Sequence, residues 1–493
     1  MTENAEIYRF LRSASCCRTC CLRFFKGPAD DYFMSVEDAL QKYGIAVDDS
    51  PTDDENPSKK VRPNTCVACL GLLESHRMEA LVEQICTNDE FRKYDCQGFN
   101  TSVSLPIAVQ VRQLSLWLSL LERFPTRFDS CKAPDITVRD AFKRILTRKL
   151  QERLGRKFST SGAVVNFSFS YVNEEAELQL LQKVKPEVFV GRKVDKQCRN
   201  VFITRNAFER NFTPENVSLD QFRQHIEVPP AIQGESISLE NVSFTGPTIF
   251  LAGRYNKISR ELSQTPWLID GKRMRENSVQ EIMTLVVGPY FGVPPDSLIF
   301  SSSGREDVDV RCLGEGRPFV LEIPNAKKDY LEETVAVKFE KVIDESKQIS
   351  VRDLQLVDRE ELVHIKHGEE DKHKVYRALC FLQNPVTLEV VKALNIEEPF
   401  VVDQWTPLRV LHRRPLLARP RTIYSVKAYA CKRNDRALIV DIVTQAGTYV
   451  KELVHGDFGR TKPNFSSIIG QPIDIHSLDV MAIALDWPKK LSR

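Results

Sequence analysis

The sequence predicts a protein of mixed helices and strands, in the α+β or α/β class, with more than one domain. Two observations carry this prediction. The chain has 493 residues, which exceeds the length at which one hydrophobic core keeps growing. Helical periodicity dominates the first half, for example at 136–155, whereas short strands alternate with helices from about residue 247 onward. The second pattern is typical of a mixed sheet with flanking helices.

The composition is that of a soluble globular protein, with 42% hydrophobic and 28% charged residues. No apolar stretch approaches the ~18–20 residues that span a bilayer, so no membrane partner is expected. The N-terminus lacks the pattern of a secretory signal. We therefore expect a nuclear and cytoplasmic protein, in which the 13 cysteines are thiols or metal ligands and not disulfides.

Two Cys-x-x-Cys pairs stand in the first 70 residues, Cys17 with Cys20 and Cys66 with Cys69. Four thiolates in two such pairs can close tetrahedrally on zinc, and a closed site of this kind is structural because it has no open position. The segment between the pairs is longer than usual and contains an acidic loop at 48–57. Cys16 or Cys21 could replace one ligand, and buried reduced cysteines or a redox pair remain alternatives. The sequence predicts one structural Zn²⁺.

These patterns divide the chain into four parts. The expected parts are a four-cysteine region with its acidic loop at 1–75, a helical domain with strands at 76–235, a linker at 236–250 and a catalytic domain at 251–493. The linker is placed where Pro, Gly and Ser are frequent and periodicity is weak.

Two aspartates, Asp307 and Asp309, stand two residues apart in "GREDVDVR", between Arg305 and Arg311. A carboxylate can act as a nucleophile or a base, and an adjacent guanidinium keeps it ionised. The sequence contains no phosphate-binding loop, no His-Glu-x-x-His and no Gly-x-Ser-x-Gly. Side chains alone are therefore expected to perform the chemistry, without an organic cofactor.

The "GREDVDVR" stretch resembles the active-site motif of pseudouridine synthases, where a Gly-Arg-x-Asp turn presents the essential aspartate. Four further stretches, at 252–273, 351–357, 406–419 and 445–464, are similar in the same order to one branch of these enzymes. That branch is the archaeal and eukaryotic tRNA pseudouridine synthase family, which acts on T-loop uridines 54 and 55. The resemblance implies a pseudouridine synthase fold, preceded by a zinc site and a THUMP-containing RNA-binding region.

The resemblance also implies roles for individual residues. Asp307 is the expected catalytic aspartate, with Arg305 and Lys451 keeping it charged and aimed. Tyr376 matches the tyrosine that stacks on the flipped base, and Leu453 is a candidate apolar contact to that base. Related enzymes have arginine where this chain has Lys451, and lysine lacks the bidentate fork.

Basic segments supply candidate contacts to RNA phosphates. The segment 408–421 contains five arginines and no acidic residue; its members are Arg409, Arg413, Arg414, Arg419 and Arg421. Arg254, Tyr255 and Lys257, in what reads as a glycine-containing loop, are expected to position RNA as well. The alternative for each cluster is a solvated charged face. The expected partners are the T-arm of tRNA and other structured RNAs, bound by a monomer.

Two other functions remain compatible with the same residues. Asp307 and Asp309 could form the acid and base of a glycosidase or N-glycosylase, because i and i+2 carboxylates on a strand lie about 6.5–7 Å apart. Alternatively, the chain could be a non-catalytic RNA-binding adaptor. A synthase needs one essential aspartate and releases no free base.

Overall fold

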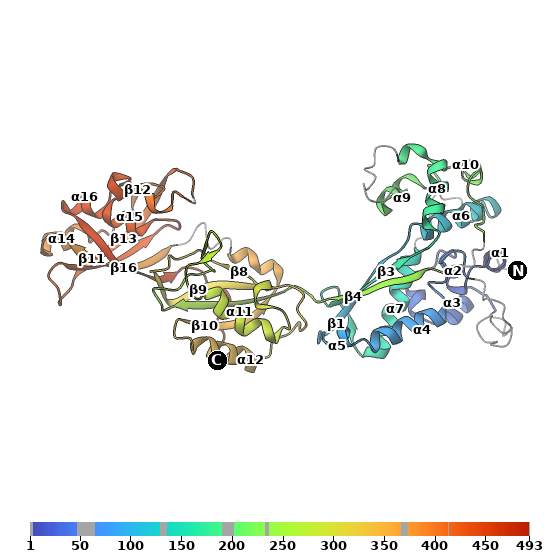
Figure 1. The fold of residues 1–493 in the computed structure, drawn as a ribbon, viewed down its shortest axis with the longest axis horizontal. Helices are drawn as coiled ribbons and strands as arrows, with labels where there is room; N and C mark the ends of the chain where they lie inside the picture. The colour runs from blue at the N-terminus through green and yellow to red at the C-terminus, as the bar shows by residue number, and fades with distance from the viewer. Residues whose placement is uncertain are drawn as a thin grey trace. The chain divides into compact units, whose positions relative to one another are not determined.

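The computed structural model describes residues 3–46, 65–128, 136–189, 202–231, 236–365, 373–412 and 414–492. The chain divides into two compact units, Met1–Gly246 and Pro247–Arg493, and each unit contains both helices and strands (Figure 1). Among the described residues, no helix is both long enough and apolar enough to cross a membrane.

The first unit combines a four-stranded sheet with helices. Its strands lie in the order β2-β1-β3-β4, and β1 runs parallel to β2 and β3, whereas β4 is antiparallel to β3. The strands are β1 (Gly98–Ser104), β2 (Lys157–Phe158), β3 (Ala163–Ser170) and β4 (Ser238–Thr245). The helices are α1 (Glu3–Ser13), α2 (Arg18–Arg23), α3 (Val36–Lys42), α4 (Ser75–Cys86), α5 (Asp89–Arg92), α6 (Ala108–Arg123), α7 (Val138–Leu154), α8 (Glu174–Val184), α9 (Arg205–Asn211), α10 (Leu219–Arg223) and the 3₁₀ turns η1 (Ala29–Phe33) and η2 (Pro186–Val188).

Helix α7 confirms the helix expected at 136–155 and packs against the sheet. Its start is a capping box in which Thr137 and Asp140 exchange side-chain-to-backbone hydrogen bonds. Its C-cap, Gly155, has φ 66°, the left-handed conformation that ends many helices. Phe142 of this helix lies edge-on to Phe167 of β3, with ring centroids 5.6 Å apart. Alternate residues of β3 are thereby buried in the core.

The segment expected to be a linker, 236–250, is largely a strand and contains the boundary between the two units at Gly246 and Pro247. Ser238–Thr245 forms β4, which pairs with β3 along its length, and β5 begins at Ile249. Leu239, Val242 and Phe244 pack against the core of the first unit. An edge strand with one half-buried face has low overall hydrophobicity, so its composition resembles that of a linker.

The second unit contains a ten-stranded mixed sheet. The strand order is β10-β5-β9-β16-β11-β14-β13-β12-β15, with β8 also paired to β9. Its long pairings are antiparallel, except that β16 runs parallel to β9. The strands are β5 (Ile249–Lys257), β8 (Ile299–Ser302), β9 (Arg311–Ile323), β10 (Ile349–Val357), β11 (Lys374–Leu382), β12 (Phe400–Trp405), β13 (Ala418–Ala430), β14 (Ala437–Thr444), β15 (Thr461–Lys462) and β16 (Ile473–Ile483), beside a small hairpin of β6 (Leu268–Ile269) and β7 (Lys272–Arg273).

Helices of the second unit flank this sheet, as the sequence predicts, and two hydrophobic clusters result. One cluster joins α11 and α12 to β5, β9 and β10, and the other joins β11, β13, β14 and β16 to α14, α15 and α16. The parallel β9–β16 pair connects the two halves of the sheet. The helices are α11 (Val279–Tyr290), α12 (Glu333–Asp344), α14 (Leu388–Ala393), α15 (Val450–His455), α16 (Phe465–Ile469) and the 3₁₀ turns η3 (Pro295–Ser297), η4 (Arg359–Leu362), η5 (Leu408–Val410) and η6 (Asp457–Gly459).

Candidate active site

Asp307 lies in the turn between β8 and β9, near the middle of the large sheet. Gly304 begins this turn with φ 88°, a conformation that glycine adopts without steric cost. A Cβ at this position would lie 2.9 Å from the Nη1 of Arg317 and from the Nζ of Lys374. The backbone conformation therefore favours glycine at this position of the Gly-Arg-x-Asp stretch, and a Cβ would displace the ends of two basic side chains.

Glu306, next to the aspartate, points into the core. Its carboxylate forms a 2.8 Å ion pair with Nε of Arg317 and accepts a 2.9 Å hydrogen bond from the hydroxyl of Tyr255. Burial disfavours the guanidinium charge of Arg317, but the adjacent carboxylate raises its pKa. Gln264 donates to the same tyrosine hydroxyl at 2.8 Å. This buried network anchors the turn on the side opposite Asp307.

The buried side chain of Lys257 binds the backbone of the turn that carries Asp307. Its ammonium group donates to the carbonyl oxygens of Leu262, Asp307 and Val308 at 2.8, 3.1 and 2.6 Å. The side chain is completely buried, and this burial lowers its pKa to about 8. Arg260 adds a 2.9 Å hydrogen bond to the carbonyl oxygen of Asp309.

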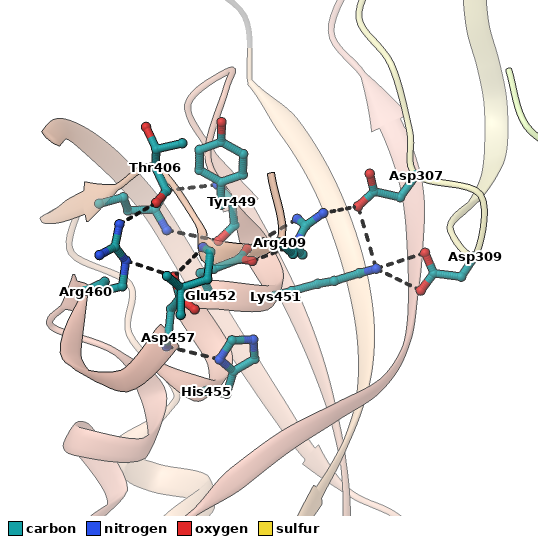
Figure 2. A network of polar contacts seen from close by, with 12 residues as sticks. Asp307, Asp309, Thr406, Arg409, Tyr449, Lys451, Glu452, His455, Asp457 and Arg460 are labelled. Atoms are coloured by element: carbon teal, nitrogen blue, oxygen red, sulfur yellow. Dashed lines mark hydrogen bonds and ion pairs between the residues drawn. The ribbon is translucent and has the colours of Figure 1, made fainter. Parts of the chain in front are cut away.

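Two cations face the carboxylate of Asp307 (Figure 2). Nη1 of Arg409 lies 2.8 Å from its Oδ2, and Nζ of Lys451 lies 3.6 Å from the same atom. Lys451 is closer to Asp309, with Nζ–O distances of 2.8 and 2.9 Å. Partial burial would raise the pKa of Asp309, but the hydrogen bonds from Lys451 lower it. Lys451 is thus shared between two aspartates.

Arg305, which the sequence predicts to lie beside the Asp307 carboxylate, is exposed and forms no ion pair within the part of the chain that the structure describes. Arg409 occupies the expected place instead. The prediction missed it because Arg409 is 102 residues from Asp307 along the chain. Its basic segment indicated only phosphate contacts.

Asp307 lines a cleft of about 1360 Å³ together with Tyr376 and Lys451. Tyr376 comes from β11, where it pairs with Ile442 of β14 and Val480 of β16. Burial raises the pKa of Tyr376 to about 12, so its hydroxyl is neutral near pH 7. The cleft is also lined by further basic side chains, and these are Arg305, Arg317, Arg359, Lys374, Arg409, Arg414, Arg419 and Arg421. An aromatic side chain, a carboxylate and many cations therefore converge in one cavity.

Four predicted RNA-binding or base-binding residues lie in the core and cannot reach RNA. Arg254, Tyr255 and Lys257 belong to strand β5 and are at most 3% exposed. Arg254 donates to the carbonyl oxygens of Leu485 and Trp487 at 2.8 and 2.9 Å. Leu453 is completely buried in α15. The stretch that reads as a loop is a strand in mid-sheet with both faces covered, so its polar groups are paired internally.

Of the five arginines predicted to contact RNA in the basic segment 408–421, four line the cleft, namely Arg409, Arg414, Arg419 and Arg421. Arg413 lies outside the described residues. Sequence reasoning missed the structural roles of Glu306 and Lys257. For Lys257 the available signal was a charged residue in the strand-like segment "IFLAGRYNK".

The cysteine cluster lies in the first unit and brings together Cys17, Cys20, Cys66 and Cys69. Their sulfur atoms all lie within 4.8 Å of one another. Four sulfurs at about 2.3 Å from a tetrahedral zinc are separated by about 3.8 Å, and the Cys17 and Cys69 sulfurs are 3.9 Å apart. The cluster can therefore hold such an ion, and Cys16 and Cys21 are buried outside it.

Backbone N–H groups are directed at the cluster. The amide of Cys17 donates to the sulfur of Cys66 at 3.1 Å, and the amide of Leu73 donates to the sulfur of Cys69 at 3.4 Å. Donors of this kind stabilise thiolates.

Comparison with known proteins identifies the family. The family model described as "Pus10, C-terminal" matches residues 250–484, and "Eukaryotic Pus10, N-terminal" matches residues 66–244. A protein of Drosophila melanogaster named "Putative tRNA pseudouridine synthase Pus10" is 44% identical, over 99% of this chain and 98% of that protein. Proteins named "tRNA pseudouridine synthase Pus10" from Xenopus laevis and Homo sapiens are each 36% identical, over 99% and 88% of this chain and 98% and 81% of their own length. The chain belongs to the Pus10 family and is a pseudouridine synthase, an isomerase that converts uridine to pseudouridine.

Proposed function

We propose that the chain modifies tRNA, converting T-loop uridine 55 and also uridine 54 to pseudouridine, with Asp307 as the nucleophile or base. The names of full-length relatives support tRNA as the substrate. The observation that carries the catalytic assignment is the position of Asp307. Its side chain is 33% exposed in the cleft and paired with Arg409 at 2.8 Å, beside Tyr376 and Lys451.

The proposed chemistry uses only these side chains and the RNA. The stacked uridine is extruded from the T-loop into the cleft, where the ring of Tyr376 stacks on it. The N1–C1′ bond breaks, the uracil turns, and a C5–C1′ bond forms; C5 then loses its proton and N1 gains one. The cations beside Asp307 direct its carboxylate for attack or proton abstraction.

The basic side chains around the cleft are proposed to contact phosphates of the T-arm. Arg414, Arg419 and Arg421 line the cavity and can supply the salt-dependent part of the affinity. Replacing Arg419 by Gln should weaken tRNA binding at low salt and reduce the slope of log affinity against log salt by about one. An unchanged slope, measured by filter binding, would remove Arg419 from the interface.

The first unit is proposed to be a THUMP-like RNA-binding domain. Gel retardation of tRNA by a variant that lacks Met1–Gly246 would test this.

We further propose that Cys17, Cys20, Cys66 and Cys69 hold one structural Zn²⁺ and that no organic cofactor takes part. The four converging sulfurs support this. Elemental analysis of the purified protein should give one zinc per chain.

The protein is also proposed to act as a monomer, in the nucleus and the cytoplasm. Light scattering coupled to gel filtration and imaging of a tagged protein test these two points.

The deciding experiment uses three unmodified tRNA transcripts. One has uridine at both positions 54 and 55, and each of the other two has uridine at one of these positions and cytidine at the other. Pseudouridine is read by carbodiimide-dependent primer-extension stops. Wild-type protein and Asp309→Asn should give T-loop stops, and Asp307→Asn should give none while it still binds tRNA. Asp309→Asn is the matched control because it removes a carboxylate from the same turn.

Three outcomes would contradict the proposal. Stops outside the T-loop would overturn the site assignment. Release of free uracil would favour a glycosylase. Equal activity of Asp307→Asn and the wild type would remove Asp307 from the chemistry.

A further inference from the structure

One guanidinium group connects the aspartate of the cleft to a carboxylate in the core (Figure 2). Nη1 of Arg409 donates to Oδ2 of Asp307 at 2.8 Å, and Nε of the same group donates to Oε1 of Glu452 at 2.7 Å. Nη2 adds a longer contact of 3.4 Å to Glu452. The planar fork of an arginine can address two carboxylates at once, which a lysine cannot do with fixed geometry.

The Glu452 end of this connection is rigid. Its side chain is only 2% exposed, and Arg409 is its sole ion-pair partner among the residues that the structure describes. A buried carboxylate without a partner is strongly destabilising. Glu452 therefore holds the guanidinium in place, whereas a solvated arginine would move among rotamers.

The backbone of Arg409 is held as well. It lies in the 3₁₀ turn η5, where the amide of Leu408 donates to Oδ2 of Asp457 at 3.3 Å. Arg460 donates to the carbonyl oxygen of Thr406 at 2.7 Å. The guanidinium is thus fixed from its own main chain and from Glu452, so that its remaining N–H groups point at Asp307.

We propose that Arg409, anchored by Glu452, is a positioning residue that sets the orientation of the Asp307 carboxylate before RNA binds. This inference rests on the proposed role of Asp307. Lys451 does not replace Arg409, because its ammonium is 3.6 Å from Asp307 and 2.8 Å from Asp309. Related enzymes have arginine at the position of Lys451. In this chain, the arginine beside the aspartate is Arg409, which comes from η5.

The surroundings of Asp307 predict what the loss of Arg409 would do. The groups beside the aspartate include Arg409, Lys451 with Asp309 behind it, Tyr376, and Lys257 on its carbonyl oxygen. Lys451 lies closer to Asp309, at 2.8 Å, so it does not hold the Asp307 carboxylate in one orientation. Without Arg409 the carboxylate would rotate among several positions, and fewer molecules would hold it in the reactive one.

The test measures single-turnover rates of pseudouridine formation with excess enzyme, together with the Kd for tRNA. For Arg409→Gln we expect a rate about 10²-fold lower and a Kd within about threefold of wild type. Arg409→Lys should recover part of the rate. Glu452→Gln should lower the rate by a smaller factor of about tenfold, with a Kd equal to that of the wild type.

Arg377→Gln is the matched control. Arg377 also forms two hydrogen bonds, of 2.7 Å each, to a carboxylate, that of Asp441 on the neighbouring strand, and it does not line the cleft. Its single-turnover rate and its Kd for tRNA should equal those of the wild type. Because Arg409→Gln leaves Glu452 unpaired in the core, the double variant Arg409→Gln/Glu452→Gln is measured as well. It carries no unpaired carboxylate and should be no slower than Arg409→Gln.

A single-turnover rate equal to that of the wild type in both Arg409→Gln and the double variant would overturn the inference. A loss confined to the Kd would do the same and would make Arg409 a phosphate contact. These results are distinct from failure of the proposed function, in which the wild type itself would form no pseudouridine on the same tRNA.

Discussion

Glu306 and Arg317 form a 2.8 Å ion pair in which the two side chains are 0% and 2% exposed. This pair turns residue 306 toward the core, so that the next residue, Asp307, faces the cleft. The unspecified position of the Gly-Arg-x-Asp motif thus has a structural role in this chain: it fastens the turn that presents the aspartate.

Replacing Glu306 by Gln should lower the free energy of unfolding by about 3–5 kcal/mol, because the Arg317 guanidinium would remain buried without a counter-charge. Urea denaturation followed by tryptophan fluorescence measures this. Glu315→Gln is the control, since the pair of Glu315 with Lys490 is exposed on both sides and is worth at most about 1 kcal/mol. Equal effects of the two substitutions would contradict the assigned role of Glu306.

The buried ammonium of Lys257 predicts a decline of activity on the alkaline side. Its pKa is lowered to about 8, so above that pH the amine has two N–H groups for three carbonyl acceptors and holds the turn less firmly. The single-turnover rate of the wild type should therefore fall as the pH rises through about 8. Lys257→Met should be about tenfold slower or more and should lack this limb.

The same shift has a definite sign for stability. Between about pH 8 and the ordinary lysine pKa of about 10.4, the unfolded chain binds a proton that the folded protein has lost. Stability of the wild type relative to Lys257→Met should therefore rise with pH in this window. A difference between the two proteins that is constant across the window would show that Lys257 keeps an ordinary pKa.

Gly304→Ala should reduce the rate by about 10²-fold, because a Cβ would press on Arg317 and Lys374 at 2.9 Å and displace the neighbouring aspartate. The left-handed backbone adds about 1–2 kcal/mol. Gly470→Ala separates the two effects: Gly470 has φ 68° and no atom within 4 Å of a built Cβ. It should lose similar stability and retain full activity. A similar rate for both variants would show that the turn tolerates a side chain.

Removal of zinc should destabilise the first unit. Cys66→Ser is expected to bring the zinc content well below one per chain and to lower the midpoint of thermal unfolding by about 10 °C or more, since metal binding contributes directly to folding. Cys431→Ser is the control, because Cys431 is a free cysteine outside the cluster. An unchanged midpoint after complete removal of the metal would mean that the cysteine cluster is stable by itself.

Local patterns in the sequence were sufficient for several features. The capped amphipathic segment at 136–155 is helix α7, and the two Cys-x-x-Cys pairs meet as expected. In each case the interacting groups are close in sequence, or the spacing of the residues already limits the geometry. The edge strand β4 was missed because its few apolar residues gain their burial only from pairing with β3.

The sequence by itself determined the chemistry that is available: an aspartate in a glycine turn, an aromatic side chain, basic segments and four thiols. Tertiary structure alone decided which cation faces which carboxylate. Arg409 and Asp307 are 102 residues apart, and the aspartate turn and the η5 segment meet because the large sheet brings them together. Tertiary structure also placed Arg254, Tyr255 and Lys257 in the core of the second unit. Burial depends on what covers a strand, and the residues of a strand do not specify its neighbours.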